Sequence, residues 1–134
     1  MRILYLHQHF STTAGAVGNR SYQMAKALVV AGHQVTMVCG RYANGHTGLS
    51  GPFRGGIREG TVDGIDVVEC DLHYSNEQGF AQRSWQFLRF MLRTIKVVLT
   101  HDYDCLFATT TPLTVGVPGL LGRHLRRKPF VFEV

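Results

Sequence analysis

Three small residues gather in the segment that follows the first apolar run of the chain. Gly15, Ala16 and Gly18 have little or no side chain, so backbone N–H groups in residues 13–20 can closely approach an anionic or sugar ligand. A helical pattern begins at Arg20, and the positive end of a helix dipole favours a phosphate at the same place. An ordinary strand-to-helix turn that needs glycine would have the same composition, so the loop alone leaves both interpretations open.

The spacing in this loop argues against two common phosphate-binding motifs. Its sequence is Gly-Ala-Val-Gly rather than G-x-G-x-x-G, and no Gly-Lys-Ser/Thr of a P-loop occurs in the chain. The next apolar run ends in Gly40-Arg41, with no acidic residue to hold a ribose. A nicotinamide-dependent dehydrogenase is therefore disfavoured.

Histidines and threonines at the ends of two apolar runs predict the walls of a crevice. His7 and His9 follow the first run, where an imidazole could act as an acid or base or hydrogen-bond a sugar hydroxyl. A metal site would need a third ligand that the sequence does not supply, so we expect a contact to ligand and no metal. Thr110 and Thr111, before Pro112, end a later run and are the expected second wall.

A basic stripe accompanies the longest helical pattern, which covers residues 84–99. Arg89, Arg93 and Lys96 are spaced at i, i+4 and i+7 beside an apolar arc that contains Trp85. We expect this arc to face the core; its residues are Trp85, Leu88, Leu92, Ile95 and Leu99. Trp85 and the three cations could lie on anionic lipid, but a solvated stripe beside a core-packed face is favoured by charge count alone.

The elements that must position these residues alternate between strand and helix. Apolar runs predict buried strands at residues 3–6, 34–39, 105–109 and 130–134, and helical spacing predicts helices at 20–31, 84–99 and 113–127, the last interrupted by Pro118. Seven glycines in residues 40–60 predict a long loop, and Asp63-Gly64 predicts the type I′ turn of a small antiparallel flap. The class is α/β: an open, mostly parallel Rossmann-like sheet with helices on both faces plus a small β-hairpin.

Composition limits the partners and the compartment. The 134 residues fit one domain, and 14 Lys and Arg against 9 Asp and Glu favour an anionic partner. The longest basic run, residues 126–128, is short and lacks stacking aromatics, so we expect no nucleic acid. Three cysteines without C-x-x-C spacing favour a reducing cytoplasm, and the apolar runs are too short for a membrane span, so any membrane contact would be peripheral.

Several segments taken together resemble the opening of family 4 glycosyltransferases. The similar segments are I-L-Y-L (3–6), G-A-V-G-N-R (15–20), A-K-A-L (25–28) and A-G-H-Q-V-T (31–36). The end, P-F-V-F-E-V (129–134), is similar to the strand that in many members runs directly into Arg-Asp-Leu-Trp. Ala16 is a departure, because many members have a second glycine there, and its methyl group narrows the approach to its own N–H.

The resemblance implies a GT-B enzyme, in which two Rossmann-like domains face each other across a cleft. It implies a retaining sugar transfer from a nucleotide sugar to a saccharide or lipid-linked acceptor, with no metal. Residues 1–134 would be the N-terminal, acceptor-side domain without the C-terminal donor-binding domain, so we assign no catalytic residue and expect no activity from residues 1–134 alone. The members most similar at the last strand imply surface polysaccharide biosynthesis at the cytoplasmic membrane face. A stand-alone binding module for a phosphorylated small molecule and a peripheral membrane adaptor are the alternatives.

Overall fold

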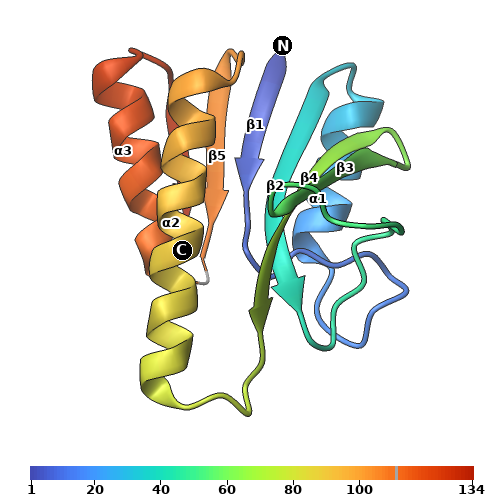
Figure 1. The fold of residues 1–134 in the computed structure, drawn as a ribbon. Coiled ribbons are helices and arrows are strands. Elements are labelled where there is room, and N and C mark those ends of the chain that lie inside the picture. The colour runs from blue at the N-terminus through green and yellow to red at the C-terminus, as the bar shows by residue number, and fades with distance from the viewer. Residues whose placement is uncertain (111) are drawn as a thin grey trace.

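The computed structural model describes residues 1–110 and 112–134, and within them six strands form one sheet (Figure 1). In chain order the strands are β1 (Arg2–Leu6), β2 (Gln34–Tyr42), β3 (Ile57–Val62), β4 (Ile65–Tyr74), β5 (Cys105–Thr109) and β6 (Phe130–Glu133). Their order across the sheet is β3-β4-β2-β1-β5-β6. All neighbours are parallel except β3 and β4, which are antiparallel. The predicted open, mostly parallel sheet is confirmed.

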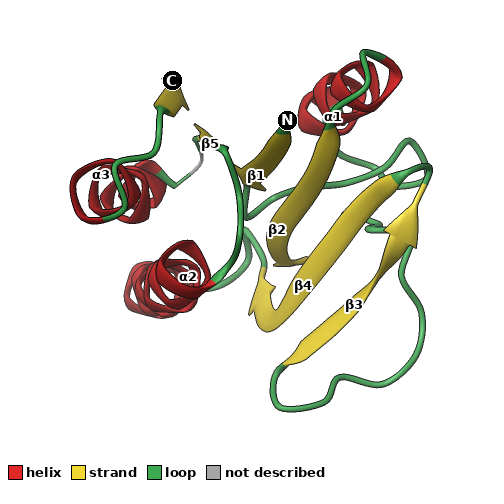
Figure 2. Ribbon diagram, turned by 90° about the horizontal axis from the view of Figure 1, so that it is seen from above, coloured by secondary structure: helices red, strands yellow, loops and turns green. Residues whose placement is uncertain are grey.

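Helices cover both faces of the sheet, as predicted. Helix α1 (Arg20–Val30) lies on one face, and α2 (Phe80–Thr100) and α3 (Gly116–Leu125) lie side by side on the other (Figure 2). A 3-10 turn, η1 (Leu113–Val115), precedes α3. The sheet has a hydrophobic core on each face, and alternate residues of β1 pack into one core or the other. Ile3 and Tyr5 pack on the α1 side, and Leu4 and Leu6 pack on the α2 side.

The direction in which strands are added reverses beside β1. The chain passes from β1 through α1 to β2 on one side, and later crosses through α2 to β5 on the other side of β1. In open α/β sheets a ligand crevice forms beyond the carboxyl ends of the strands at such a reversal. The topology therefore places the loops after β1 and β5 at the same edge.

The predicted hairpin exists, but it is not a separate flap. Asp63 and Gly64 have φ angles of 50° and 81°, which fits the type I′ turn expected from Asp-Gly. However, β4 pairs with β2 along its length and lies inside the main sheet, while β3 is the edge strand. Strand β3 begins at Ile57, inside the segment predicted as a loop. Its hydrogen-bonded pairing with β4 makes these residues a strand, although their sequence does not indicate one.

The prediction of which side of α2 faces the core was wrong. The side chains buried against the sheet are those of Phe90, Thr94 and Val98, whereas Trp85 and Leu92 are 56% and 55% exposed. Helix α2 carries two apolar stripes, and the stripe with Phe90 and Val98 packs into the core that includes Leu72 and Leu106. Periodicity detects each stripe but does not determine which one meets the sheet.

Pro118 does not interrupt a helix. It is the third residue of α3, inside the first turn, where no intrahelical hydrogen bond is lost. The irregular part of the predicted 113–127 helix is instead η1, which precedes α3.

Candidate functional site

A cavity of about 300 Å³ opens at the carboxyl ends of β1 and β5. Its lining comes from four places in the fold: the loop after β1, the start of α1 with the residues just before it, the end of β2 and the end of β5. The lining residues are His7, His9, Val17, Gly18, Arg20, Ser21, Tyr42, Thr109 and Thr110. We call this cavity the crevice. It brings together five of the predicted site residues: His7, His9, Gly18, Arg20 and Thr110. Thr111, the other predicted wall residue, lies outside the described residues.

The first half of the small-residue loop packs against another loop rather than facing the crevice. The Gly15 N–H donates to the Thr12 carbonyl (3.2 Å), and the Ala16 N–H donates to the Asn44 carbonyl (2.8 Å). A Cβ on Gly15 would lie 2.8 Å from the His46 backbone nitrogen, so glycine is required there for packing. Both N–H groups are therefore engaged within the chain, which differs from their expected role as ligand donors.

The second half of the loop does face the crevice. A Cβ on Gly18 would meet no atom of the described residues within 4 Å, and Val17, Gly18 and Arg20 all line the cavity. Helix α1 begins here at Arg20, and no side chain of residues 1–110 or 112–134 caps its first turn. Its leading N–H groups are therefore placed to donate to a ligand.

The two crevice histidines are uncharged at neutral pH. Burial is the main cause that lowers the pKa of His7 to about 4, with a smaller contribution from His9, and burial lowers the pKa of His9 to about 4 as well. The His7 Nδ1 is 2.7 Å from the Ser21 hydroxyl oxygen in the first turn of α1. The His9 Nε2 is buried and has no hydrogen-bond partner in the described part of the chain.

The charge of Arg20 is compensated by a carboxylate that also takes part in a chain of hydrogen bonds. The Arg20 guanidinium forms an ion pair with the Glu133 carboxylate at the end of β6. The other Glu133 oxygen accepts a hydrogen bond from the Thr109 hydroxyl (2.9 Å), which is 3.0 Å from the Tyr5 hydroxyl. Sequence reasoning missed Glu133; the available signal was its position at the end of an apolar strand, where Thr109 also ends one.

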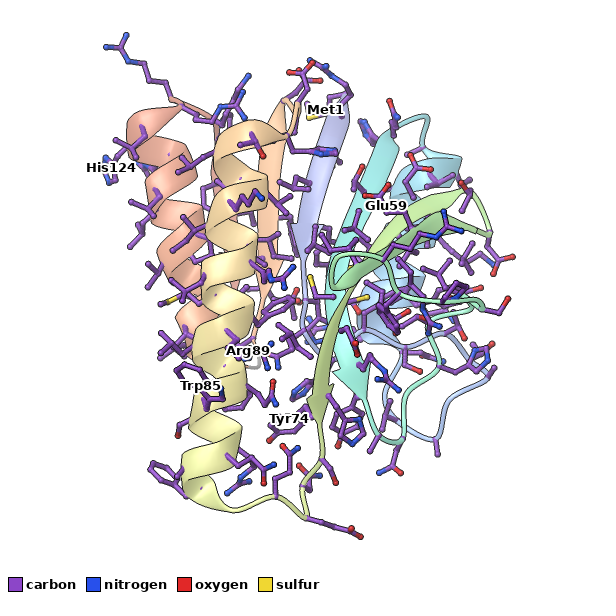
Figure 3. All side chains as sticks on the ribbon, in the orientation of Figure 1. Met1, Glu59, Tyr74, Trp85, Arg89 and His124 are labelled. Atoms are coloured by element: carbon purple, nitrogen blue, oxygen red, sulfur yellow. The ribbon has the colours of Figure 1, made fainter. Side chains whose placement is uncertain are left out.

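Aromatic rings form a second feature that sequence reasoning missed. The His9 ring stacks on Tyr42 with centroids 4.7 Å apart, and it lies 4.4 Å from the Tyr74 ring. Tyr74 in turn stacks on Phe87 of α2 at 5.2 Å, and Figure 3 shows Tyr74 between the lower half of α2 and the sheet. This aromatic cluster links the crevice to α2 and offers ring surfaces beside it.

A smaller polar cavity lies next to the crevice and shares Tyr42 with it. Its volume is about 220 Å³. One wall is built on the buried Glu69 carboxylate, which accepts from the Arg58 Nε (2.7 Å) and from the Thr47 hydroxyl (2.7 Å). The glycine-rich segment predicted as a loop therefore contributes the wall of a cavity.

The crevice suits a neutral, hydroxyl-rich ligand. Neutral imidazoles, threonine and serine hydroxyls and helix N–H groups can each donate or accept single hydrogen bonds. The cation that lines it, Arg20, is already paired. In residues 1–110 and 112–134, no three His, Cys, Asp or Glu side chains are grouped to hold a metal ion, and the expected absence of a metal stays a prediction.

The predicted membrane-contact residues lie together and do not line the crevice. Trp85, Arg89, Arg93 and Lys96 line a shallow depression on the outer side of α2, and Figure 3 shows Trp85 and Arg89 on its lower half. None of the described helices combines the length and apolarity that crossing a bilayer requires.

Comparison with known proteins identifies the family. Residues 15–134 match the model of the glycosyl transferase 4-like domain. No curated protein matches the chain.

Two solved structures share the fold. The C-terminal domain of a hydrogenase from Pyrococcus furiosus aligns with a TM-score of 0.62 at 13% identity, over 99% of this chain and 91% of that one. Sucrose-phosphate synthase from Thermosynechococcus elongatus aligns with a TM-score of 0.55 at 14% identity, over 98% of this chain and 31% of that one. The chain thus spans about a third of the synthase. On the family match, it belongs to the glycosyl transferase 4-like domain family.

Proposed function

We propose that this chain is the acceptor-binding domain of a retaining glycosyltransferase that uses a nucleotide sugar as donor. The observation that carries the proposal is the crevice at the reversal beside β1, which is lined by hydroxyl groups and neutral imidazoles and whose lining cation, Arg20, is paired with Glu133. A sugar acceptor presents hydroxyl groups and an apolar ring face, which match the hydrogen-bonding groups and the aromatic cluster respectively.

The same geometry is poorly suited to the diphosphate of a donor. A diphosphate binds best to free cations or to several unengaged N–H groups. His7 and His9 are neutral because burial depresses their pKa to about 4, and Arg20 is paired with Glu133. The N–H groups of Gly15 and Ala16 are also engaged. We therefore assign the donor to a second domain, so that residues 1–134 alone bind acceptor without transferring sugar.

The biological context extends this proposal. The resemblance of residues 129–134 to enzymes acting on lipid-linked saccharides supports a role in surface polysaccharide biosynthesis, with a saccharide or lipid-linked saccharide as acceptor. The proposal needs no metal ion, since the crevice residues act by hydrogen bonding.

Saturation-transfer difference NMR on this domain tests the proposal. The probes are glucose, galactose, mannose, N-acetylglucosamine and cellobiose, with UDP-glucose and glucose 1-phosphate as the anionic comparison. Gly18→Leu and Gly79→Leu are matched variants, because a Cβ at either position meets no atom of the described residues within 4 Å and only Gly18 lines the crevice.

We expect transfer to at least one saccharide in the wild type and in Gly79→Leu, and its loss in Gly18→Leu. Stronger transfer to UDP-glucose or glucose 1-phosphate, lost in the same variant, would instead support a binding module for a phosphorylated molecule. The absence of a saccharide signal from the wild type would contradict the proposal.

A further inference from the structure

The outward side of α2 is apolar, which is unusual for a helix on the surface of a soluble domain. Four exposed large side chains, spaced three, four and seven residues apart, lie on one stripe of the helix: Trp85, Leu88, Leu92 and Leu99. The opposite side of the helix, which carries Phe90 and Val98, is the side that packs into the core. The described chain therefore leaves much of the outward stripe uncovered: Trp85 and Leu92 are more than half exposed, and Leu88 and Leu99 are 39% exposed.

The neighbouring helix continues the same surface. Leu113 of η1 is 67% exposed, and Val117, Leu120 and Leu125 of α3 are also exposed. Helices α2 and α3 lie against each other on one face of the sheet (Figure 2). We call the outer side of α2, η1 and α3 the apolar face. Exposed apolar residues gathered on one side of a domain are typical of an interaction surface.

Charge identifies the partner of the apolar face. The segments 80–100 and 113–128 together contain eight Lys and Arg residues and no Asp or Glu. Arg89, Arg93 and Lys96 border the apolar stripe of α2, and Arg123 follows Leu120 at the end of α3. Cations around an apolar surface match anionic headgroups around acyl chains, and each basic residue near such a surface adds roughly 1 kcal/mol.

We propose that the apolar face docks on the surface of an anionic lipid bilayer. Trp85 lies at the border between the apolar stripe and the cations, a position that suits the headgroup level of a bilayer. The helices lie in the plane of the interface and do not span it, which agrees with their composition.

This docking stands on its own observations, but it has a consequence for the proposed function. The N-terminal half of α2 extends past the carboxyl ends of β1 and β5 (Figure 1). Phe87, two residues from Trp85, stacks on Tyr74 in the aromatic cluster beside the crevice. A bilayer on the apolar face would therefore lie next to the crevice, where an acceptor carried on lipid can enter.

Trp85 is the only tryptophan of the sequence, so its fluorescence reports on the apolar face alone. The domain is titrated with vesicles of phosphatidylglycerol and phosphatidylcholine, and separately with vesicles of phosphatidylcholine alone. With anionic vesicles we expect a blue shift, protection from acrylamide and quenching by brominated acyl chains, all reversed by high salt. Co-sedimentation measures the partition coefficient.

Two pairs of variants locate the contact. Lys96→Gln should lower the partition coefficient about fivefold, while Lys26→Gln, an exposed lysine on α1 across the sheet, should change it less than about twofold. Leu92→Gln should likewise weaken binding, while Val30→Gln on α1 should not. Circular dichroism checks that each variant is folded.

Several results would overturn the proposal. One is an unchanged Trp85 spectrum with phosphatidylglycerol vesicles at low salt. Another is equal binding to neutral vesicles, or equal losses in Lys96→Gln and Lys26→Gln. Protection of Trp85 that depends on protein concentration without lipid, together with a dimer by size exclusion, would show that a second copy covers the face. These outcomes do not depend on saccharide binding, so failure of docking and failure of the proposed function are distinguishable.

Discussion

Acidification should destabilise this domain through the two histidines of the crevice. Burial places the pKa of His7 and of His9 at about 4 in the folded state, against about 6.5 for an exposed histidine in the unfolded chain. Between these values the unfolded state binds more protons than the folded state. The free energy of unfolding therefore falls as pH falls through this window and is constant above about pH 7.5.

The size of the effect follows from the shifts. Between pH 7 and pH 5.5, an unfolded histidine of pKa 6.5 becomes largely protonated while a folded one of pKa about 4 stays neutral. That difference is about 1 kcal/mol for each histidine, or about 2 kcal/mol for both. Asp104, whose pKa is lowered to about 2 chiefly by its hydrogen bond to Arg2, affects stability below about pH 5 and does not interfere between pH 7 and pH 5.5.

Urea denaturation at pH 7.0, 6.25 and 5.5 measures this difference. The double variant His7→Gln with His9→Gln should lose about 2 kcal/mol less on acidification than the wild type. His124→Gln, on the exposed end of α3, is the matched control and should follow the wild-type curve. If the double variant loses as much stability as the wild type, His7 and His9 are not buried neutral groups, and the crevice does not present neutral imidazoles to a ligand.

Two further predictions concern the loops around the crevice. Gly15→Ala should lower the free energy of unfolding by about 1–3 kcal/mol, because its Cβ would lie 2.8 Å from the His46 nitrogen. Gly18→Ala should leave the melting temperature within about 2 °C of wild type, since each kcal/mol of stability shifts it by about 4 °C. Equal losses of stability in Gly15→Ala and Gly18→Ala would contradict the assigned packing. Glu69→Gln should cost about 2–3 kcal/mol, because Glu69 is buried and its neighbour Arg58 would lose its charge partner. Asp71→Asn, in an exposed ion pair, should cost less than about 1 kcal/mol by the same urea assay, and similar costs for the two would refute the difference in burial.

The order of the elements could be predicted because each signal was local. Apolar runs located β1 and β5 within one residue, and Asp63-Gly64 located the hairpin turn, since turn chemistry depends on two adjacent residues. The start of β3 was missed because its sequence, I-R-E-G-T-V, has no apolar run. Only the hairpin arm next to Asp63 was predicted, and pairing with β4 makes the rest a strand.

The orientation of α2 could not be predicted, because both of its sides are apolar. A stripe that contains Trp85 and Leu92 and a stripe that contains Phe90 and Val98 satisfy the same helical period. The difference arises from the shape of the core beneath the helix, which depends on residues far away in sequence. Which stripe is exposed follows only from which stripe packs against the sheet.

The site was predictable in its location and less so in its contacts. The ends of β1 and β5 meet at one edge of any parallel sheet, so His7 and Thr110 could be placed together from the order of elements. The bond from the Ala16 N–H to Asn44 and the ion pair of Arg20 with Glu133 join residues 28 and 113 positions apart. No local pattern indicates such contacts, and both engage groups that could otherwise bind a phosphate.

Locating saccharide binding on the domain by NMR tests the proposed acceptor site most directly. Backbone amide shifts are followed while cellobiose, maltose or N-acetylglucosamine is added, and again with UDP-glucose. We expect at least one saccharide to shift the amides of Gly18, Ser21 and Thr110, which line the crevice, and UDP-glucose to leave them unchanged. Saccharide shifts confined to residues outside the crevice, or the same crevice amides responding to UDP-glucose alone, would contradict an acceptor site in the crevice.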